Sequence, residues 1–475
     1  MILKLTVYHG NFVDTPSLGG VRIRHQTTIG VGTDGKILFI KENSQDALKD
    51  ALEFDRTLEA SEVAVVKIPD SQNGSFFFPG FVDTHVHASQ YPNAGIFGSS
   101  TLLDWLQTYT FPLEASLKDI DTARAVYNRV LDRTLANGTT TASYYTTIDA
   151  ASSNLMAKIC AEKGQRAFIG KVCMDQNSPD YYIESLHECK RSTHQVIDYI
   201  TKELKDEKIQ PVLTPRFAPS CSRELMSWLG ELAREEDLHV QTHLSENSVE
   251  LELVAELFPE CESYSHVYDN HHLLTKKTVL AHCVHLSDKE IELLKLRGCG
   301  VSHCPISNSS LASGECRVRL LLDNGINVGL GTDLSGGYSS SILAVARQAL
   351  LVSRHLAMKE KDPKKQKHVN LSVEDVLFLA SLGGAQALSI GGVVGSFEVN
   401  KQFDAQLIDL DRTSSNVDVF SWQRTSWNDS PGEEENQKLA RNLLAKWLFT
   451  GDDRNTARVW VAGRLVHCNA ALTAQ

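Results

Sequence analysis

The sequence predicts an α/β barrel of eight parallel strands, joined to a small β-sandwich that both ends of the chain build. Between residues 76 and 394, short extended runs alternate with amphipathic helical stretches, and this alternation is typical of a barrel with parallel strands. Residues 1–75 and 395–475 carry short extended runs separated by turn residues, which predict strands. We therefore expect a barrel domain over 76–394 and a sandwich that the two flanking segments build.

The predicted barrel strands are rich in β-branched, aromatic and aliphatic residues, and turn-forming residues separate them from their neighbours. The eight runs are FVDTHVHAS (81–89), TTTASYYTT (139–147), RAFIGKVCMD (166–175), PVLTPRFAPS (211–220), HVQTHLSEN (239–247), TVLAHCVHL (278–286), GVSHCPISN (300–308) and NVGLGTDLSGG (327–337). Among the helices between them, residues 121–138 end in a glycine and residues 222–238 open at a serine cap. Together these runs supply a complete set of barrel strands.

Further elements are predicted outside the barrel strands. Strands are expected at 3–13, 21–32, 36–42, 395–399, 403–410 and 457–468, and a helix at 372–388. Two polar inserts, 359–368 and 426–437, are expected to be solvated loops.

Composition and charge limit the classes of function. The chain has 475 residues, of which 42% are hydrophobic, and its formal net charge is -12 at pH 7. A negative surface repels phosphate groups, which argues against nucleic acid and anionic membranes as partners. The first residues lack the features of a secretory signal, and the ten cysteines form no CxxC pair, which favours reduced thiols. We therefore expect a cytoplasmic protein without a membrane span.

Two histidines one residue apart give the first indication of a metal site. His85 and His87 lie in a run that predicts a strand, and side chains two apart on a strand point to the same face. Both imidazoles can therefore reach one metal ion. A His-x-His pair alone is a weak signal, because neutral imidazole also packs within protein cores. A metal site requires further ligands at the ends of other strands.

Three more residues of suitable chemistry end other predicted strands. His243 ends the fifth strand, His282 the sixth and Asp333 the eighth. Barrels of this kind gather their chemistry at the carboxyl ends of the strands, so these side chains and the first-strand pair are expected to converge. Imidazoles and a carboxylate suit Zn²⁺ or Fe²⁺ with a water in an open coordination position.

The fourth strand bears on the number of metal ions. Barrel hydrolases with two metal ions need a bridging ligand there, commonly a carboxylated lysine, whereas this strand offers Arg216 and no lysine. Lys171 on the third strand lies before a cysteine and a methionine rather than at the strand end. We therefore expect one metal ion.

Six short segments carry a resemblance to a known family. HASQYPNAG, TPRFAPSCS, THLSEN, AHC, SHCPISN and GTDLSGG together resemble the guanine deaminase branch of the amidohydrolase superfamily, over about Pro79 to Gly337. The resemblance implies a distorted (β/α)8 TIM barrel with a small β-sandwich, one zinc ion per subunit with Fe²⁺ as the alternative, and a homodimer. It also implies hydrolytic deamination of guanine to xanthine and ammonia. Asn400 stands where the family usually has glycine, a difference expected to affect only a turn.

The resemblance also implies roles for individual residues. The implied metal ligands are His85, His87, His243 and Asp333. The implied catalytic residues are Glu246 as proton shuttle, His282, which holds the water, and Asp333. The implied purine-binding residues are His87, Ala88, Ser89, Gln90, Arg216, Phe217, His243, Glu246 and Asp333.

The chemistry of Arg216 and Glu246 suits these roles. A guanidinium group only donates hydrogen bonds and stays charged, so Arg216 complements the O6 and N7 acceptors of guanine. Adenine presents a donor amine at the corresponding carbon and is disfavoured. Glu246 follows His243 by three residues, so its carboxyl group can protonate a ring nitrogen and later the leaving amine.

Two other functions stay open on the sequence. A related mononuclear hydrolase could act on a pterin, a triazine or an oxidised purine, and kinetics with guanine against those compounds separate it. A non-catalytic scaffold of the same fold is the second alternative, and metal analysis separates it. Such scaffolds generally lose metal ligands, whereas all five strand-end positions are filled here.

Overall fold

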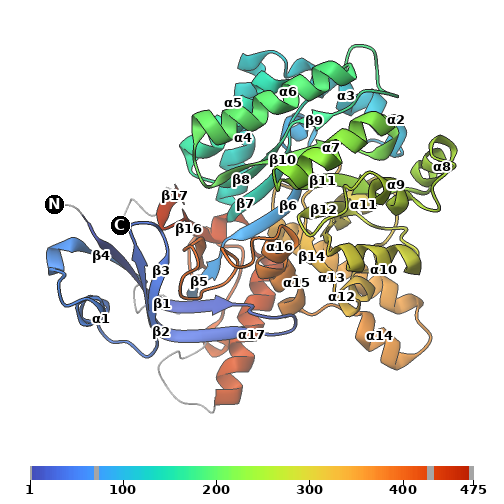
Figure 1. Cartoon of the computed structure of the whole chain (residues 1–475). Coiled ribbons are helices and arrows are strands. Elements are labelled where there is room, and N and C mark those ends of the chain that lie inside the picture. The colour runs from blue at the N-terminus through green and yellow to red at the C-terminus, as the bar shows by residue number, and fades with distance from the viewer. Residues whose placement is uncertain (1–2, 69–73, 425–432, 470–475) are drawn as a thin grey trace.

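The computed structural model describes residues 3–68, 74–424 and 433–469. Within these ranges the chain forms a barrel of parallel strands surrounded by helices, with a mixed β-sheet beside it (Figure 1). The strands of both chain ends lie in this mixed sheet, on the same side of the barrel (Figure 1). The predicted fold class is confirmed.

Nine strand segments occupy the eight positions of the barrel. They are β6 (Phe81–His87), β7 (Thr139–Tyr145), β8 (Arg166–Gly170), β9 (Val172–Cys173), β10 (Ile209–Pro215), β11 (His239–Leu244), β12 (Thr278–His282), β13 (Gly300–His303) and β14 (Asn327–Leu330). β14 pairs with β6, and β10 pairs with β11, so the ring of parallel strands is closed. β8 and β9 both pair with β10, because the third strand is interrupted at Lys171. All eight predicted strands are present.

Small polar side chains cross-link the inside of the barrel. Ser143 donates to the Gln241 side-chain oxygen at 2.7 Å, and the Gln241 amide donates to Thr214 Oγ1 at 3.0 Å. The hydroxyl groups of Thr84 and Ser302 are 2.6 Å apart. All five side chains are fully buried, so their hydrogen bonds replace the water that they lose on folding. These bonds hold the strands in register.

Helices cover the outside of the barrel. They include α4 (Ile120–Ala136), α5 (Ala150–Lys163), α6 (Leu186–Asp198), α7 (Arg223–Glu235), α8 (Ser248–Leu257), α9 (Tyr264–Asn270), α10 (Asp288–Arg297), α11 (Pro305–Ser310), α12 (Val318–Asp323), α13 (Ile342–Lys359), α14 (Pro363–Val369), α15 (Val373–Leu379) and α16 (Leu382–Ala387). α4 is followed by Gly138, whose φ of +82° favours glycine. α7 begins at Ser222, whose side chain accepts from the Leu225 amide. Both predicted helix ends are confirmed.

Strands from both chain ends form one eight-stranded mixed sheet. They are β1 (Leu5–Asp14), β2 (Arg22–Gly32), β3 (Ile37–Lys41), β4 (Val63–Lys67), β5 (Ser75–Pro79), β15 (Ala405–Asp409), β16 (Thr456–Val461) and β17 (Arg464–Cys468). β5 joins the two ends, because it pairs with β1 on one side and with β15 on the other. Aromatic rings pack within this part of the molecule: Tyr8 stacks on Phe403 with centroids 4.0 Å apart, and Phe12 on Phe77 at 4.6 Å. The chain ends therefore join as predicted.

Four predicted elements differ from the structure. Residues 457–468 form a hairpin of β16 and β17 and not one strand, because Ala462 and Gly463 turn the chain with positive φ. Residues 372–388 form two helices, α15 and α16, because Ser381 between them leaves the helical conformation, with a φ of −128° and a ψ of −98°. Residues 395–399 form no strand. Residues 359–368 are solvent-exposed as expected but are largely helical, since Asp362 caps α14 and Pro363 occupies its first turn.

The second polar insert lies only partly within the described residues. Residues 426–432 are outside them, whereas 433–437 begin α17 (Glu433–Thr450), a helix that was not predicted. Its buried Trp447 stacks on Phe81 of β6 with centroids 5.8 Å apart, so burial of an aromatic face holds the helix on the barrel. Asn400 lies in a turn, as expected, and adopts a φ of +73°, a conformation that glycine adopts readily and asparagine tolerates.

A series of short helical segments connects β6 to α4, and we call residues 88–116 the strap. It consists of η2 (Ala88–Asn93), α2 (Leu102–Trp105), η3 (Leu106–Thr110) and α3 (Phe111–Ser116). α2, η3 and α3 follow one another without a break as one helical run over 102–116. The strap was not predicted, because the π-helical stretch η3 shifts the helical period and Pro112 lies within the run. Among the described helices, none has both the length and the apolar character of a bilayer-spanning segment.

Candidate metal centre and active site

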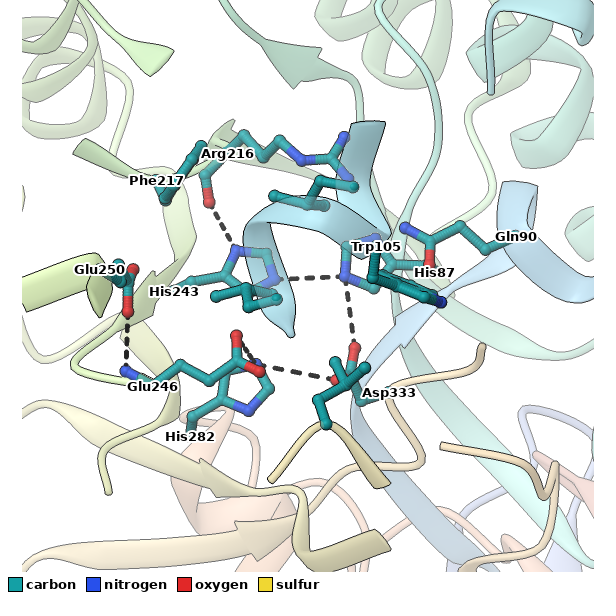
Figure 2. Close-up of a pocket in the computed structure, with 13 residues that line it drawn as sticks. His87, Gln90, Trp105, Arg216, Phe217, His243, Glu246, Glu250, His282 and Asp333 are labelled. Atoms are coloured by element: carbon teal, nitrogen blue, oxygen red, sulfur yellow. Dashed lines mark hydrogen bonds and ion pairs between the residues drawn. The ribbon is translucent and has the colours of Figure 1, made fainter. Parts of the chain in front are cut away.

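Four side chains gather at the carboxyl ends of the barrel strands, and we call them the donor cluster. His85 and His87 come from β6, His243 from β11, and Asp333 follows β14. One ligand atom of each lies within 4.8 Å of the others. His87 Nε2 is 3.2 Å from His243 Nε2 and 3.4 Å from Asp333 Oδ1 (Figure 2). Asp333 Oδ1 is also 3.1 Å from His85 Nε2. The structure thus brings together the four residues expected to bind metal.

Backbone hydrogen bonds place Asp333 against β6. The Asp333 amide donates to the His85 carbonyl at 2.9 Å, and the Thr332 amide donates to Asp83 at 3.0 Å. Asp333 has a φ of +45° and His282 a φ of +72°. This left-handed conformation costs a non-glycine residue about 1–3 kcal/mol and is common at functional sites. The bonds to β6 hold Asp333 in that conformation.

The donor cluster matches the requirements of a divalent metal ion. Burial lowers the pKa of all three histidines, and for His87 and His243 the shift is large, so the imidazoles are neutral and offer lone pairs. Although burial opposes it, His85 holds the pKa of Asp333 well below its usual range. His243 Nδ1 donates to the Arg216 carbonyl at 2.5 Å, which leaves Nε2 free of a proton. Three imidazoles and one carboxylate fit Zn²⁺ or Fe²⁺.

A carboxyl–imidazole pair lies beside the donor cluster. His282 Nε2 is 3.4 Å from Glu246 Oε2 and 3.7 Å from Asp333 Oδ2 (Figure 2). His282 Nδ1 donates to Asn308 Oδ1 at 2.8 Å, so Nε2 faces the two carboxylates. Burial raises the pKa of Glu246 to about 7. Although burial opposes it, Glu246 and Asp333 raise the pKa of His282. The pair can therefore share one proton near neutral pH.

A second buried carboxylate, Glu250, fixes the backbone of Glu246. Glu250 Oε2 accepts from the Glu246 amide at 2.9 Å and from the Asn247 amide at 3.3 Å. Its other oxygen accepts from the Tyr264 hydroxyl at 2.9 Å. Because Glu250 is the third residue of α8 and Asn247 its cap, these bonds form a capping box. The start of α8 therefore fixes the backbone position from which the Glu246 side chain extends.

Replacing Glu250 by alanine is expected to lower the free energy of unfolding by about 1–3 kcal/mol, because a buried amide loses its acceptor. It is also expected to lower kcat, because Glu246 loses its backbone anchor. Glu250→Gln is the matched control, since the amide oxygen still accepts from the backbone. Chemical denaturation and steady-state kinetics of both variants check this. Equal losses in the two variants would mean that the charge of Glu250, and not its acceptor, matters.

A cavity lies between the donor cluster and the strap. The residues that line it are His87, Gln90, Leu102, Trp105, Leu106, Arg216, Phe217, His243, Glu246, Glu250, His282, Leu311 and Asp333 (Figure 2). Its volume is about 30 Å³, whereas ligand pockets measure about 300–1,000 Å³. In this conformation the cavity is therefore too small for a purine, and Leu102, Trp105 and Leu106 of the strap form part of its apolar wall.

The structure places most of the expected purine-binding residues at this cavity. Gln90, Arg216 and Phe217 line it together with His87 and Glu246. Ala88 and Ser89 are buried beside it and are not among its lining residues. The Ser89 hydroxyl donates to the Thr146 carbonyl at 3.0 Å.

Several residues at the site were not predicted from the sequence. They are the apolar wall of Leu102, Trp105, Leu106 and Leu311, and the polar residues Glu114, Glu250 and Asn308. Asn247 and Glu250 form a capping-box pattern in the sequence, which could have indicated that Glu250 contacts the backbone beside Glu246. The others carry no local signal, because only the fold brings them to the cavity.

The chain matches the amidohydrolase family over residues 76–466. Together with the barrel and the donor cluster, this match defines the class of the protein as a barrel hydrolase. The probable guanine deaminase of Schizosaccharomyces pombe is 49% identical over 97% of this chain and 83% of its own length. The guanine deaminase of Homo sapiens is 40% identical over 97% of this chain and 96% of its own length.

A solved structure gives the same result. The crystal structure of guanine deaminase from C. acetobutylicum, which has guanine bound in its active site, matches with a TM-score of 0.83 and 33% identity. The match covers 98% of this chain and 100% of that one. The chain belongs to the amidohydrolase family and, within it, to the guanine deaminases.

Proposed function

We propose that this protein hydrolyses guanine to xanthine and ammonia, with one zinc ion per subunit. The observation that supports this most is that Arg216, Gln90 and Glu246 line one cavity together with three members of the donor cluster, His87, His243 and Asp333. Recognition, proton transfer and metal binding can therefore act on one molecule. The guanine bound to the C. acetobutylicum relative supports the same substrate.

The reaction exchanges the amino group on C2 of guanine for an oxygen from water. A divalent metal ion held by the donor cluster would supply Lewis acidity and lower the pKa of water toward neutrality. Asp333 Oδ2 and His282 Nε2, 3.7 Å apart, can hold a water molecule between them, and Asp333 can accept one of its protons. His282 is fixed for this purpose by Asn308.

Glu246 moves the protons. Its raised pKa keeps a proton available, which it donates to the ring nitrogen beside C2 as the water oxygen bonds to that carbon. The same carboxyl group then takes a proton from the new C2 hydroxyl and delivers it to the amine. The C2–N bond breaks, ammonia leaves and the carbonyl of xanthine forms. At this point Asp333 holds one proton from water and Glu246 lacks the proton that it gave to the ring, and transfer of that proton from Asp333 through His282 to Glu246 restores both carboxyl groups. In the balance, one water proton has replaced the proton given to the ring and the other is on ammonia.

The substrate preference rests on the donors of Arg216. Its side chain lines the cavity, and guanidinium offers only donors to whatever binds there. The O6 and N7 atoms of guanine accept hydrogen bonds, whereas the 6-amino group of adenine would place a donor against a donor. This arrangement leaves the 2-amino group of guanine to face the donor cluster.

Incubation of the zinc-loaded protein with guanine is expected to yield xanthine and ammonia in equal amounts. Absorbance spectroscopy and an ammonia assay measure the two products. Adenine, a pterin, a triazine and an oxidised purine serve as competing substrates at the same concentration. If guanine reacts no faster than these compounds, the substrate assignment is wrong.

A further inference from the structure

A buried carboxylate on the strap contacts both base-reading side chains. Glu114, in α3, is fully buried. Its Oε2 accepts from Arg216 Nη1 at 2.7 Å and its Oε1 accepts from Arg216 Nη2 at 3.2 Å, so the ion pair is bidentate. Oε1 also accepts from Gln90 Nε2 at 2.8 Å, and Oε2 from the Tyr182 hydroxyl at 2.7 Å. One carboxylate therefore holds three neighbours from three different parts of the chain.

These bonds determine which polar atoms remain for a ligand. Each terminal nitrogen of Arg216 uses one N–H for Glu114, so a second N–H on each remains available to another acceptor. The amide nitrogen of Gln90 is turned to Glu114, and its oxygen lies on the other side, 3.5 Å from the Ser335 amide. A reversed Gln90 amide would place two acceptors against each other. Glu114 thus fixes which hydrogen-bond donors and acceptors Arg216 and Gln90 present to a bound base.

Glu114 also balances the charge of Arg216. Both residues are at most 2% exposed, and a buried guanidinium without a partner is strongly unfavourable. The Phe111 ring, from the same short helix, lies 5.1 Å from the Arg216 guanidinium carbon and excludes water from it. The pair offers donors to the cavity without an excess of positive charge. Such an edge suits an uncharged base and gives an anion little Coulombic advantage.

We infer that Glu114 is a positioning residue that sets the selectivity of the site for an uncharged purine. This inference rests on the proposed function, in which xanthine is the product. The second carbonyl group of xanthine makes its ring N–H groups more acidic than those of guanine, so xanthine forms an anion more readily. By cancelling the charge of Arg216, Glu114 keeps this anion from being retained. By fixing Arg216 and Gln90, it keeps the site ordered for guanine.

The test compares Glu114→Gln with the unaltered zinc-loaded protein at mildly alkaline pH, where more xanthine is the anion. The variant keeps the size of the side chain and removes its charge. We expect KM for guanine to rise about 10- to 100-fold, the effect of losing a charge-assisted hydrogen bond. The ratio of this KM to the Kd of xanthine should rise at least about tenfold, and kcat should fall less than KM rises. Calorimetry measures the Kd without any turnover.

Three variants distinguish positioning from a merely structural role. Arg216→Ala should make the KM effect of Glu114→Gln small, because Glu114 then has no guanidinium to place. Tyr182→Phe removes one hydrogen bond to Glu114 and keeps its charge, so it should raise KM slightly without favouring xanthine. Glu184→Gln unpairs the buried Lys171 outside the cavity and should affect stability alone.

Three results would overturn the inference. They are an unchanged ratio of KM to Kd in Glu114→Gln, effects of Glu114→Gln and Arg216→Ala that simply add, and a Glu184→Gln variant with the same kinetic change. If Glu114→Gln does not fold, the xanthine Kd and KM of Tyr182→Phe decide, since an unchanged KM there removes the positioning role. If the Kd of xanthine changes as expected in Glu114→Gln but the unaltered protein does not convert guanine, the result contradicts the proposed function and not the inference about Glu114.

Discussion

Replacing Glu246 by glutamine is expected to lower kcat by about 10²–10⁴-fold while the protein still binds its metal ion. Glutamine has nearly the same shape and cannot carry a transferable proton, so the change removes general acid–base catalysis. Glu246 is not part of the donor cluster, and its pKa of about 7 keeps the proton available near neutral pH. Steady-state kinetics with guanine and metal analysis of the same preparation check this.

Glu290→Gln is a suitable control for Glu246→Gln. Glu290 is also a buried carboxylate after a barrel strand, and it caps α10 through Ser287, away from the cavity. Its replacement should affect stability and leave kcat nearly unchanged. An unaltered kcat in Glu246→Gln would refute the shuttle role. Loss of the metal ion in Glu246→Gln would mean that this carboxylate supports the donor cluster instead.

Replacing His243 by alanine is expected to abolish stoichiometric metal binding and to lower kcat/KM by at least about 10³-fold. Lewis-acid catalysis is worth several kcal/mol, and about 1.4 kcal/mol corresponds to a factor of ten in rate. His243 supplies one of the four ligand atoms that lie within 4.8 Å of one another. Metal analysis after dialysis and kinetics with added zinc measure both effects.

His303→Ala is the matched control for His243→Ala. His303 is also a buried histidine at the carboxyl end of a barrel strand, β13. It lines a separate cavity of about 520 Å³ with residues of α12 and α13, and it is not in the donor cluster. This variant should bind metal as the unaltered protein does. Normal metal content in His243→Ala would mean that the ion binds elsewhere.

The barrel and the donor cluster could be predicted because their signals are local. Each barrel strand is a short buried run between turn residues, and all seven residues of β6 are buried. Strand alternation puts His85 and His87 on one face, and parallel strands bring their carboxyl ends together. The positions of His243 and Asp333 at strand ends were therefore sufficient to predict that their side chains lie close to those of His85 and His87.

The strap and Glu114 could not be predicted for a physical reason. α2, η3 and α3 follow one another without a break over 102–116, but the π-helical stretch η3 shifts the period and Pro112 lies within the run, so no regular amphipathic pattern marks a helix. Glu114 by itself looks like an ordinary solvated glutamate. Its burial depends on Arg216, 102 positions further along the chain, and no local pattern reports such a partner. α17 was missed because its apolar residues follow an acidic run typical of a loop.

The strap supplies apolar residues to the cavity wall and also holds Arg216, which links the admission of a ligand to its recognition. Because the cavity of about 30 Å³ is too small for a purine, side chains that line it must move before a purine can bind beside the donor cluster. Phe111 and Glu114 lie in the same helical run as Trp105 and Leu106, so a displacement of that run would also weaken the contacts with Arg216. A molecule that makes no hydrogen bonds to Arg216 and Gln90 does not stabilise the strap over the cavity, and bulk water then stays in the site. Entry of the base and its recognition thus depend on the same part of the chain.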